Sequence, residues 1–352
     1  MGMTMDEPHR RVRRVPGARL VGLVAALGLL VAVSALPSAH TAFSATSGTP
    51  VNSLAADHLR PPSGLSVTQT CSYAPVVLRG ALASTKVSPL TLSPPPGTAA
   101  GDVLVAQVAY YGTSPITAPS GWTRITLTDT SGGVVTSAVY WKLAAGTEPA
   151  ADFARPTSES GDMVGGIVAY RGVSGSTPVA VAGGAAGSGQ MATTPALTTT
   201  ATGAVVIHLL TRSGGQPPAP TGTNPLWTHS SDSETVTAAD EAFAGPGAVP
   251  QRTSTTSGST TAWIAQTVVL RPALQQVGAS LSWTATPSSW ADGHTLERFA
   301  GGTVQANHPV PLGTTTATDA GLVNGTTYGY RLWAYRGTWV SAAVTTTLTP
   351  AC

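Results

Sequence analysis

The sequence has little charge and few aromatic side chains. Of its 352 residues, 10% are Asp, Glu, Lys or Arg and 6% are Phe, Trp or Tyr. It has two cysteines, and it lacks the G-x-S-x-G, H-E-x-x-H, P-loop and C-x-x-C motifs. We therefore expect no serine hydrolase, zinc protease, phosphate-binding NTPase or thiol redox activity. We also expect no cofactor and no metal site built on histidine, because the seven histidines are scattered without the spacing of metal ligands. The carboxylates Asp232, Glu234 and Asp240 leave a Ca²⁺ site open, but the spaced Asp/Asn-Gly loop of a strong site is missing.

A basic surface for nucleic acid is also missing. The formal net charge is +2, but five arginines lie between residues 10 and 19. Without residues 1–42, the chain has 13 basic and 14 acidic residues, so no excess of positive charge remains. Binding to nucleic acid depends on such an excess. The sequence therefore predicts that nucleic acid is not a partner.

Small and β-branched residues dominate what is present. Hydrophobic residues make up 42% of the chain, and it has 39 glycines and 28 prolines among many Thr, Ser, Ala and Val residues. β-Branched side chains suit a pleated sheet, whereas Gly and Pro interrupt helices. The length is sufficient for two domains with cores of their own. This composition predicts an all-β fold of many short strands.

The N-terminal segment has the pattern of an export signal. The arginine-rich stretch HRRVRRVPGAR precedes the apolar run LVGLVAALGLLVAVSAL, which is roughly 17 residues long. Small residues follow, although His40 interrupts the best cleavage pattern. We expect residues 1–44 to be a signal peptide or an uncleaved signal anchor, and residues 45–58 to be a linker. The remainder would be extracellular or on the cell surface, with the membrane contacted only through this N-terminal helix.

The two cysteines, Cys71 and Cys352, fit an oxidising compartment. An even number of cysteines in an exported chain makes one disulfide the simplest expectation. The alternative is a pair of buried free thiols, for which the last residue of the chain offers little surrounding core.

The C-terminal part resembles a fibronectin type III domain. The resemblance covers about 70 residues, from LSWTATPSSWADGHTLERF to TTTATDAGLVNGTTYGYRLWAYRGTWVSAAVTTTLTP. It implies that Leu281 and Trp283 are core residues of a second strand. It also implies that Leu322 and Tyr328 form a tyrosine corner, in which the ring is buried and the hydroxyl ties the preceding turn.

A first strand for this domain is missing immediately upstream, but LRPPSGLSVTQTCS at residues 59–72 has the expected alternation. We therefore predict a split fibronectin-like domain, residues 59–72 plus 273–352, with residues 73–272 inserted. An insertion of this kind needs ends that meet in space. The similar stretches PVVLRGAL (75–82) and TVVLRPAL (267–274) suggest two strands lying side by side at those ends.

The insertion contains two similar segments that indicate an internal repeat. GDVLVAQVAYYGTSPITAPSGWTRI begins at Gly101, and GAVVIHLLTRSGGQPPAPTGTNPLWTHS begins at Gly203; each combines an apolar strand, a Pro-rich turn and a Trp-Thr pair. This predicts a second β-sandwich, either duplicated or jelly-roll-like. The pattern is similar to a β-sandwich module of secreted bacterial and phage surface proteins, and TAFSATSGTPVNSLAA resembles the N-terminal region of exported actinobacterial-type surface proteins.

Tryptophans are the best candidates for binding residues. Trp290 and Trp339 fall in two loops that lie at one pole of a fibronectin-like domain, and Trp227 follows a Pro-containing turn. Such rings stack on sugars or anchor protein partners, although two tryptophans can also pack on each other and cap a core. We predict a non-catalytic binding, adhesion or envelope-structural protein whose partner is a cell-wall glycan or an envelope protein. The alternatives are a carbohydrate-binding accessory protein and a hydrolase of envelope polysaccharide that uses paired loop carboxylates.

Overall fold

The computed structural model describes residues 57–130, 132–257 and 261–352. The predicted signal segment 1–44 and most of the predicted linker 45–58 lie outside these residues. Within them the structure is all-β, without a helix, so the predicted fold class is confirmed at this level. Accordingly, no described helix is long and apolar enough to span a membrane.

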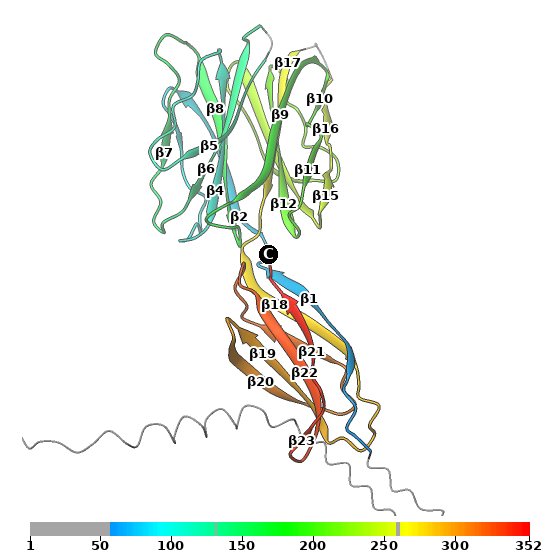
Figure 1. Cartoon of the computed structure of the whole chain (residues 1–352). Helices are drawn as coiled ribbons and strands as arrows, with labels where there is room; N and C mark the ends of the chain where they lie inside the picture. Colours follow the sequence, from blue (N-terminus) through cyan, green and yellow to red (C-terminus); the bar gives the residue numbers. More distant parts are fainter. Residues whose placement is uncertain (1–56, 131, 258–260) are drawn as a thin grey trace, which may run out of the picture. The chain divides into compact units, whose positions relative to one another are not determined.

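One β-sandwich is formed by the first strand of the described chain and by its C-terminal strands (Figure 1). We call it the fibronectin-like sandwich. One sheet has the order β1-β18-β21, and the other has the order β20-β19-β22-β23, with β24 also paired to β22. The strands are β1 (Ser63–Tyr73), β18 (Leu274–Thr284), β19 (Gly293–Ala300), β20 (Thr303–Pro311), β21 (Thr316–Ala320), β22 (Tyr328–Arg336), β23 (Trp339–Val340) and β24 (Val344–Leu348).

The first strand of this sandwich pairs with a strand that begins about 200 residues later in the chain. β1 runs antiparallel to β18, with Val67 opposite Leu281 and Cys71 opposite Val277. Apolar residues at alternate positions of β1 and β18 face the second sheet, because successive side chains of a strand point to opposite faces. This is the pairing that the alternation in residues 59–72 predicts.

The core of the fibronectin-like sandwich contains the four residues that the resemblance singles out. Leu281 is fully buried, and Trp283, Leu322 and Tyr328 are each 5% exposed in the same cluster. The Tyr328 hydroxyl accepts a hydrogen bond of 3.0 Å from the Val323 backbone N–H. The tyrosine therefore fills the core with its ring and ties the preceding turn with its hydroxyl.

The remaining strands, β2–β17, form the region that we call the inserted sandwich (Figure 1). Its first half contains β2 (Val77–Val87), β3 (Leu90–Leu92), β4 (Val103–Tyr111), β5 (Thr123–Asp129), β6 (Val135–Leu143), β7 (Ala151–Phe153) and β8 (Asp162–Arg171). Its second half contains β9 (Val179–Gly189), β10 (Met191–Thr193), β11 (Leu197–Thr199), β12 (Ala204–Ser213), β13 (Asn224–Ser230), β14 (Glu234–Phe243), β15 (Gly247–Val249), β16 (Thr253–Thr255) and β17 (Thr261–Leu270).

The two halves repeat one topology. The first half forms a five-stranded sheet of order β2-β8-β4-β6-β5, and the second half forms one of order β9-β17-β12-β14-β13. A short pair, β3-β7 or β11-β15, accompanies each sheet. Bulges interrupt the register between Arg124 and Thr126 and between Pro225 and Trp227, which are corresponding places in the two sheets. Of the two arrangements that the sequence leaves open, this strand order is that of a duplicated sandwich.

Both faces of the central strands of the two large sheets are buried. Val103 and Val205 belong to a cluster that draws residues from both sheets, whereas their neighbours Leu104 and Val206 belong to separate clusters with the short strands. Burial on both faces explains why VLVAQVAYY and AVVIHLLTR are almost continuously apolar instead of alternating.

The ends of the inserted sandwich meet, as an insertion requires. Ala74 N donates to Ala273 O at 2.8 Å, and Ala273 N donates to Gly172 O at 2.8 Å. Gly172 has a φ of +77°, and a Cβ there would lie 2.1 Å from the Pro75 carbonyl oxygen, so glycine is needed at this crossing.

Two expectations about the insertion are wrong in detail. The similar stretches at 75–82 and 267–274 do not lie side by side, because β2 pairs with β8, whereas β17 pairs with β12 and β9 in the other sheet. The two Trp-Thr pairs are not equivalent either. Opposite the bulge, Thr126 pairs with Val139 and Trp227 pairs with Ala238, so Thr126 holds the place of Trp227.

Candidate ligand-binding pole

Two loops of the fibronectin-like sandwich carry Trp290 and Trp339. The first loop, residues 285–292, joins β18 to β19. The second is the hairpin of β22 and β23, in which Arg336 pairs with Trp339 across Gly337 and Thr338. Gly337 has a φ of +52°, which suits the first central position of a two-residue hairpin loop. We call residues 285–292 and 336–340 the loop pole.

Polar contacts join the two loops. Arg336 Nη1 donates to the Trp290 carbonyl at 2.7 Å, and the guanidinium carbon lies 5.4 Å from the centre of the Trp290 ring. Gly337 N donates to Asp292 Oδ2 at 2.8 Å, and Asp292 N donates to the Tyr335 carbonyl at 2.9 Å. The structure therefore brings together the two loops that the sequence predicts at one pole, and holds them by hydrogen bonds in both directions.

Trp339 and Val340 form the exposed tip of the loop pole. Their side chains are 64% and 63% exposed, whereas Trp290 is half-buried beneath Arg336. A Trp339 ring with this exposure does not cap a core. An exposed indole that lies opposite Arg336 in the hairpin can stack on a sugar ring or anchor a protein partner.

A buried histidine supports the first loop from within the sandwich. His294 is fully buried, and its Nε2 accepts a hydrogen bond of 3.1 Å from Thr286 N. Burial lowers the pKa of His294, which keeps the ring neutral and Nε2 available as an acceptor near neutral pH. Thr286 Oγ1 also donates to the Arg60 carbonyl at 2.5 Å, so the chain entering β1 lies against this loop.

Trp227, the third predicted binding residue, is not available at the surface. It is 7% exposed and lies in the cluster between the two large sheets of the inserted sandwich. A Cβ on Gly166 of β8 would come within 2.3 Å of Trp227 Cε2, so the indole packs directly on this glycine. The assignment of Trp227 to a binding site is therefore wrong, because β8 supplies a flat surface that buries the ring.

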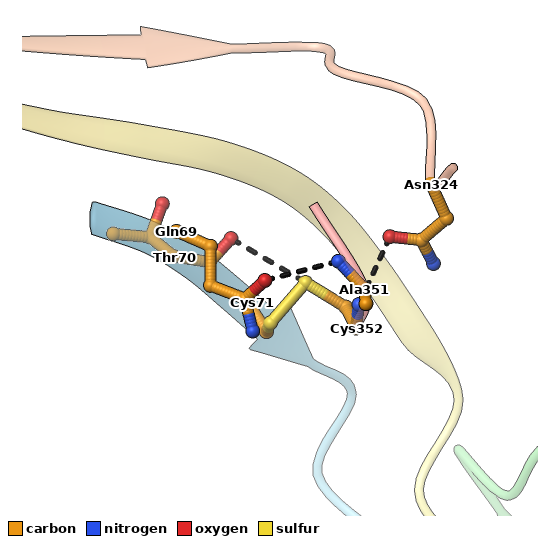
Figure 2. The surroundings of a disulfide bond; sticks show 6 residues. All are labelled: Gln69, Thr70, Cys71, Asn324, Ala351 and Cys352. Carbon is orange, nitrogen blue, oxygen red and sulfur yellow. Dashed lines mark hydrogen bonds between the residues drawn. A yellow bond between two sulfur atoms is a disulfide. The ribbon is translucent and has the colours of Figure 1, made fainter. Parts of the chain in front are cut away.

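The other pole of the fibronectin-like sandwich carries the disulfide (Figure 2). Cys71, on β1, is bonded to Cys352. Ala351 N donates to Gln69 Oε1 at 2.9 Å, and Cys352 N donates to Asn324 Oδ1 at 3.0 Å. The C-terminal residues are thus held by one covalent bond and two side-chain acceptors.

The sequence did not single out Arg336, Asp292, Val340 or His294 as part of this site. Arg336 and Asp292 are placed by the hairpin and by the contact between the loops, neither of which leaves a local signature. The adjacency of Val340 to Trp339 was the one usable signal, because two large apolar residues after a Gly-Thr turn sit at a hairpin tip.

Three of the loop carboxylates that a glycosidase would use are engaged in local contacts. Each accepts a hydrogen bond from a nearby side chain: Glu148 from Lys142, Asp152 from Thr91 and Glu159 from Ser114. Across the described ranges, no group of three or more His, Cys, Asp or Glu side chains could hold a metal ion.

One hydroxyl–imidazole–carboxylate row does occur in the inserted sandwich. Thr267 Oγ1 lies 3.5 Å from His208 Nδ1, and His208 Nε2 lies 2.8 Å from Glu241 Oε1. Thr267 is 1% exposed and His208 is fully buried, so no substrate reaches the hydroxyl. Burial lowers the pKa of His208, and Arg252 pairs with Glu241, which are features of a satisfied structural network.

No protein-family model matches the chain, and no curated protein matches its sequence. Among solved structures, a two-domain fibronectin type III segment of chicken tenascin is 13% identical, with 49% of this chain and 99% of that chain covered and a TM-score of 0.19. The FN1–FN3 domains of chicken CNTN1 are 14% identical, with 82% and 98% covered and a TM-score of 0.19. At these scores neither likeness supports a conclusion about the role of this chain.

Proposed function

We propose that this protein is a non-catalytic, exported recognition protein that binds its partner through the loop pole. The observation that carries the proposal is the exposure of Trp339 and Val340, 64% and 63%, on a hairpin anchored by Arg336 and Asp292. Exposing two large apolar side chains to water is unfavourable unless a partner covers them, and a rigid hairpin reduces the entropy lost on binding.

Two features support a location outside the cytoplasm. A disulfide between Cys71 and Cys352 persists in an oxidising compartment, and the Arg-rich, apolar N-terminal segment has the pattern of an export signal. The protein is then secreted, or is anchored at the cell surface if the signal stays uncleaved. In either case its role is adhesion or attachment within the envelope.

The partner that fits the loop pole best is a cell-wall glycan or an envelope protein. An indole stacks on the apolar face of a pyranose, and the neighbouring guanidinium and carboxylate can hydrogen-bond its hydroxyls. This combination favours a carbohydrate-binding accessory protein as the second candidate. A hydrolase has less support, since three of the carboxylates considered for it, Glu148, Asp152 and Glu159, are engaged in local contacts.

The experiment is a retention screen on cell-wall glycans, insoluble polysaccharides and whole cells. The variants are Trp339→Ala and Val340→Ser, and the matched control is Val323→Ser, whose side chain is 60% exposed in the β21–β22 loop. We expect the parent and the control to be retained on one class of material and both loop-pole variants to be lost.

Retention on glycan alone identifies the carbohydrate-binding candidate, whereas retention on protein-containing envelope alone identifies a protein partner. Equal retention of the parent and Trp339→Ala contradicts binding through the loop pole. Failure of the parent to bind any of these materials contradicts the recognition role itself.

A further inference from the structure

A polar pocket lies at one end of the second sheet of the inserted sandwich, separate in sequence and in fold from the loop pole. It has a volume of about 210 Å³ and is lined by residues 214–216 and 230–235. These residues supply Ser and Thr hydroxyls, the Gln216 amide and two carboxylates, Asp232 and Glu234. The lining contains no Lys, Arg or His, so nothing in it balances the two negative charges.

Glu234 is the residue in this pocket whose carboxylate has one oxygen without a hydrogen-bond donor and no positive charge in the lining. It is 1% exposed, and its Oε2 accepts a hydrogen bond of 3.2 Å from Ser231 Oγ. Its Oε1 is buried and has no hydrogen-bond partner among the described residues. A buried carboxylate is costly unless a counter-charge or several hydrogen bonds accompany it. Burial accordingly raises the pKa of Glu234 to about 7.

The surrounding donors are those that a hard cation prefers. Ca²⁺ takes six to eight oxygen ligands from carboxylates, amides, carbonyls and water in flexible geometry, whereas Mg²⁺ demands a nearly ideal octahedron. Asp232 is exposed on the same turn, two residues before Glu234. Asp240, a third carboxylate of this acidic stretch, is not part of the pocket, because Tyr170 and Asn224 hydrogen-bond to it.

We propose that this pocket binds Ca²⁺, with Glu234 and Asp232 as the charged ligands and neutral oxygens of the 214–216 loop and the 230–235 turn completing the shell. Two carboxylates form a weakly charged site, so the expected dissociation constant is that of extracellular modules, roughly 10⁻⁴–10⁻³ M. The ion would cross-link the loop after β12 to the turn between β13 and β14 and so stabilise this end of the sheet.

The test is urea unfolding of the purified full chain in CaCl₂ and in EDTA at matched ionic strength, together with calorimetric titration of Ca²⁺. We compare the parent with Glu234→Gln, which removes the charge, and with the control Asp152→Asn, which removes a carboxylate on β7. At a Ca²⁺ concentration ten times the dissociation constant, the unfolding equilibrium constant should fall about elevenfold. The effect should be absent in Glu234→Gln and unchanged in the control.

Should Glu234→Gln fail to fold, Asp232→Asn, a change at an exposed residue, should still weaken Ca²⁺ binding. No saturable stabilisation by millimolar Ca²⁺ at pH 8, or full stabilisation of Glu234→Gln, overturns the proposal. This test is independent of the retention screen.

Discussion

Removing the disulfide should weaken the fibronectin-like sandwich by several kcal/mol. The double variant Cys71→Ser/Cys352→Ser frees the end of β1 from the last residue of the chain, which are 281 residues apart in sequence. Cys352 N would still donate to Asn324, and Ala351 N to Gln69, but these two hydrogen bonds do not restrict the unfolded chain. The covalent link does restrict it, which is why most of its effect is expected in the unfolded state.

The magnitude depends on whether the inserted sandwich unfolds at the same time. If everything unfolds together, the closed loop of 281 residues corresponds to about 5.6 kcal/mol at 25 °C. If the inserted sandwich stays folded, Ala74 and Ala273 remain one hydrogen bond apart. The flexible loop then shrinks to residues 71–74 and 273–352, roughly 80 residues, and the expected loss is about 4.5 kcal/mol.

The assay is urea unfolding of the parent and the double variant, followed by tryptophan fluorescence and circular dichroism. We expect two transitions, of which only that of the fibronectin-like sandwich moves, by about 4.5 kcal/mol. Reductant should shift the parent in the same way and leave the variant unchanged. A loss of less than about 1 kcal/mol, or free thiols in non-reducing peptide mapping of the parent, would refute this reasoning.

Three further changes test individual contacts. Trp227→Ala should destabilise the inserted sandwich by about 3–5 kcal/mol, measured by urea unfolding, and should not affect ligand retention; a cost below about 1 kcal/mol would contradict its core placement. Tyr328→Phe should cost about 1–2 kcal/mol because a turn amide loses its acceptor, and an unchanged unfolding midpoint would rule out that role. Burial lowers the pKa of His294 in the folded chain, so as the pH falls the unfolded chain binds a proton at this residue before the folded chain does. The free energy of unfolding should therefore be full above about pH 6.5, and should fall as the pH decreases from there to the folded-state pKa. In His294→Gln that part of the pH slope should vanish, and an unchanged slope would contradict the assignment.

Local patterns were sufficient to predict much of the fibronectin-like sandwich. The alternation in residues 59–72 identified β1, and a buried tyrosine after a Gly-containing turn identified the corner at Tyr328. Export and an even cysteine count predicted the link between Cys71 and Cys352. Each of these features depends on one strand or turn, or on a general property of the compartment. Such features can therefore be recognised in one sequence without knowledge of the fold.

Features that depend on contacts between distant strands were not predictable. Trp122 and Trp227 follow similar turns, but Trp122 lies four residues before Thr126, the residue that corresponds to Trp227 in the first sheet. The Trp122 ring therefore packs on the outer face of its sheet, whereas the Trp227 ring packs between the two large sheets. The surface that buries Trp227 is Gly166, on a strand from the other half. The exposure of Trp339 could be predicted from its place on a hairpin. The contacts of Arg336 with Trp290 could not, because they join two loops that are distant in sequence.

The measurement that addresses the loop pole most directly is hydrogen–deuterium exchange of the chain with and without a soluble fragment of the material that retains it. Recognition through the loop pole predicts that protection gained on binding is confined to residues 285–292 and 336–340, and that the inserted sandwich exchanges at its free rate. Protection confined to β2–β17, with the loop pole unchanged, would contradict it and place the partner on the inserted sandwich.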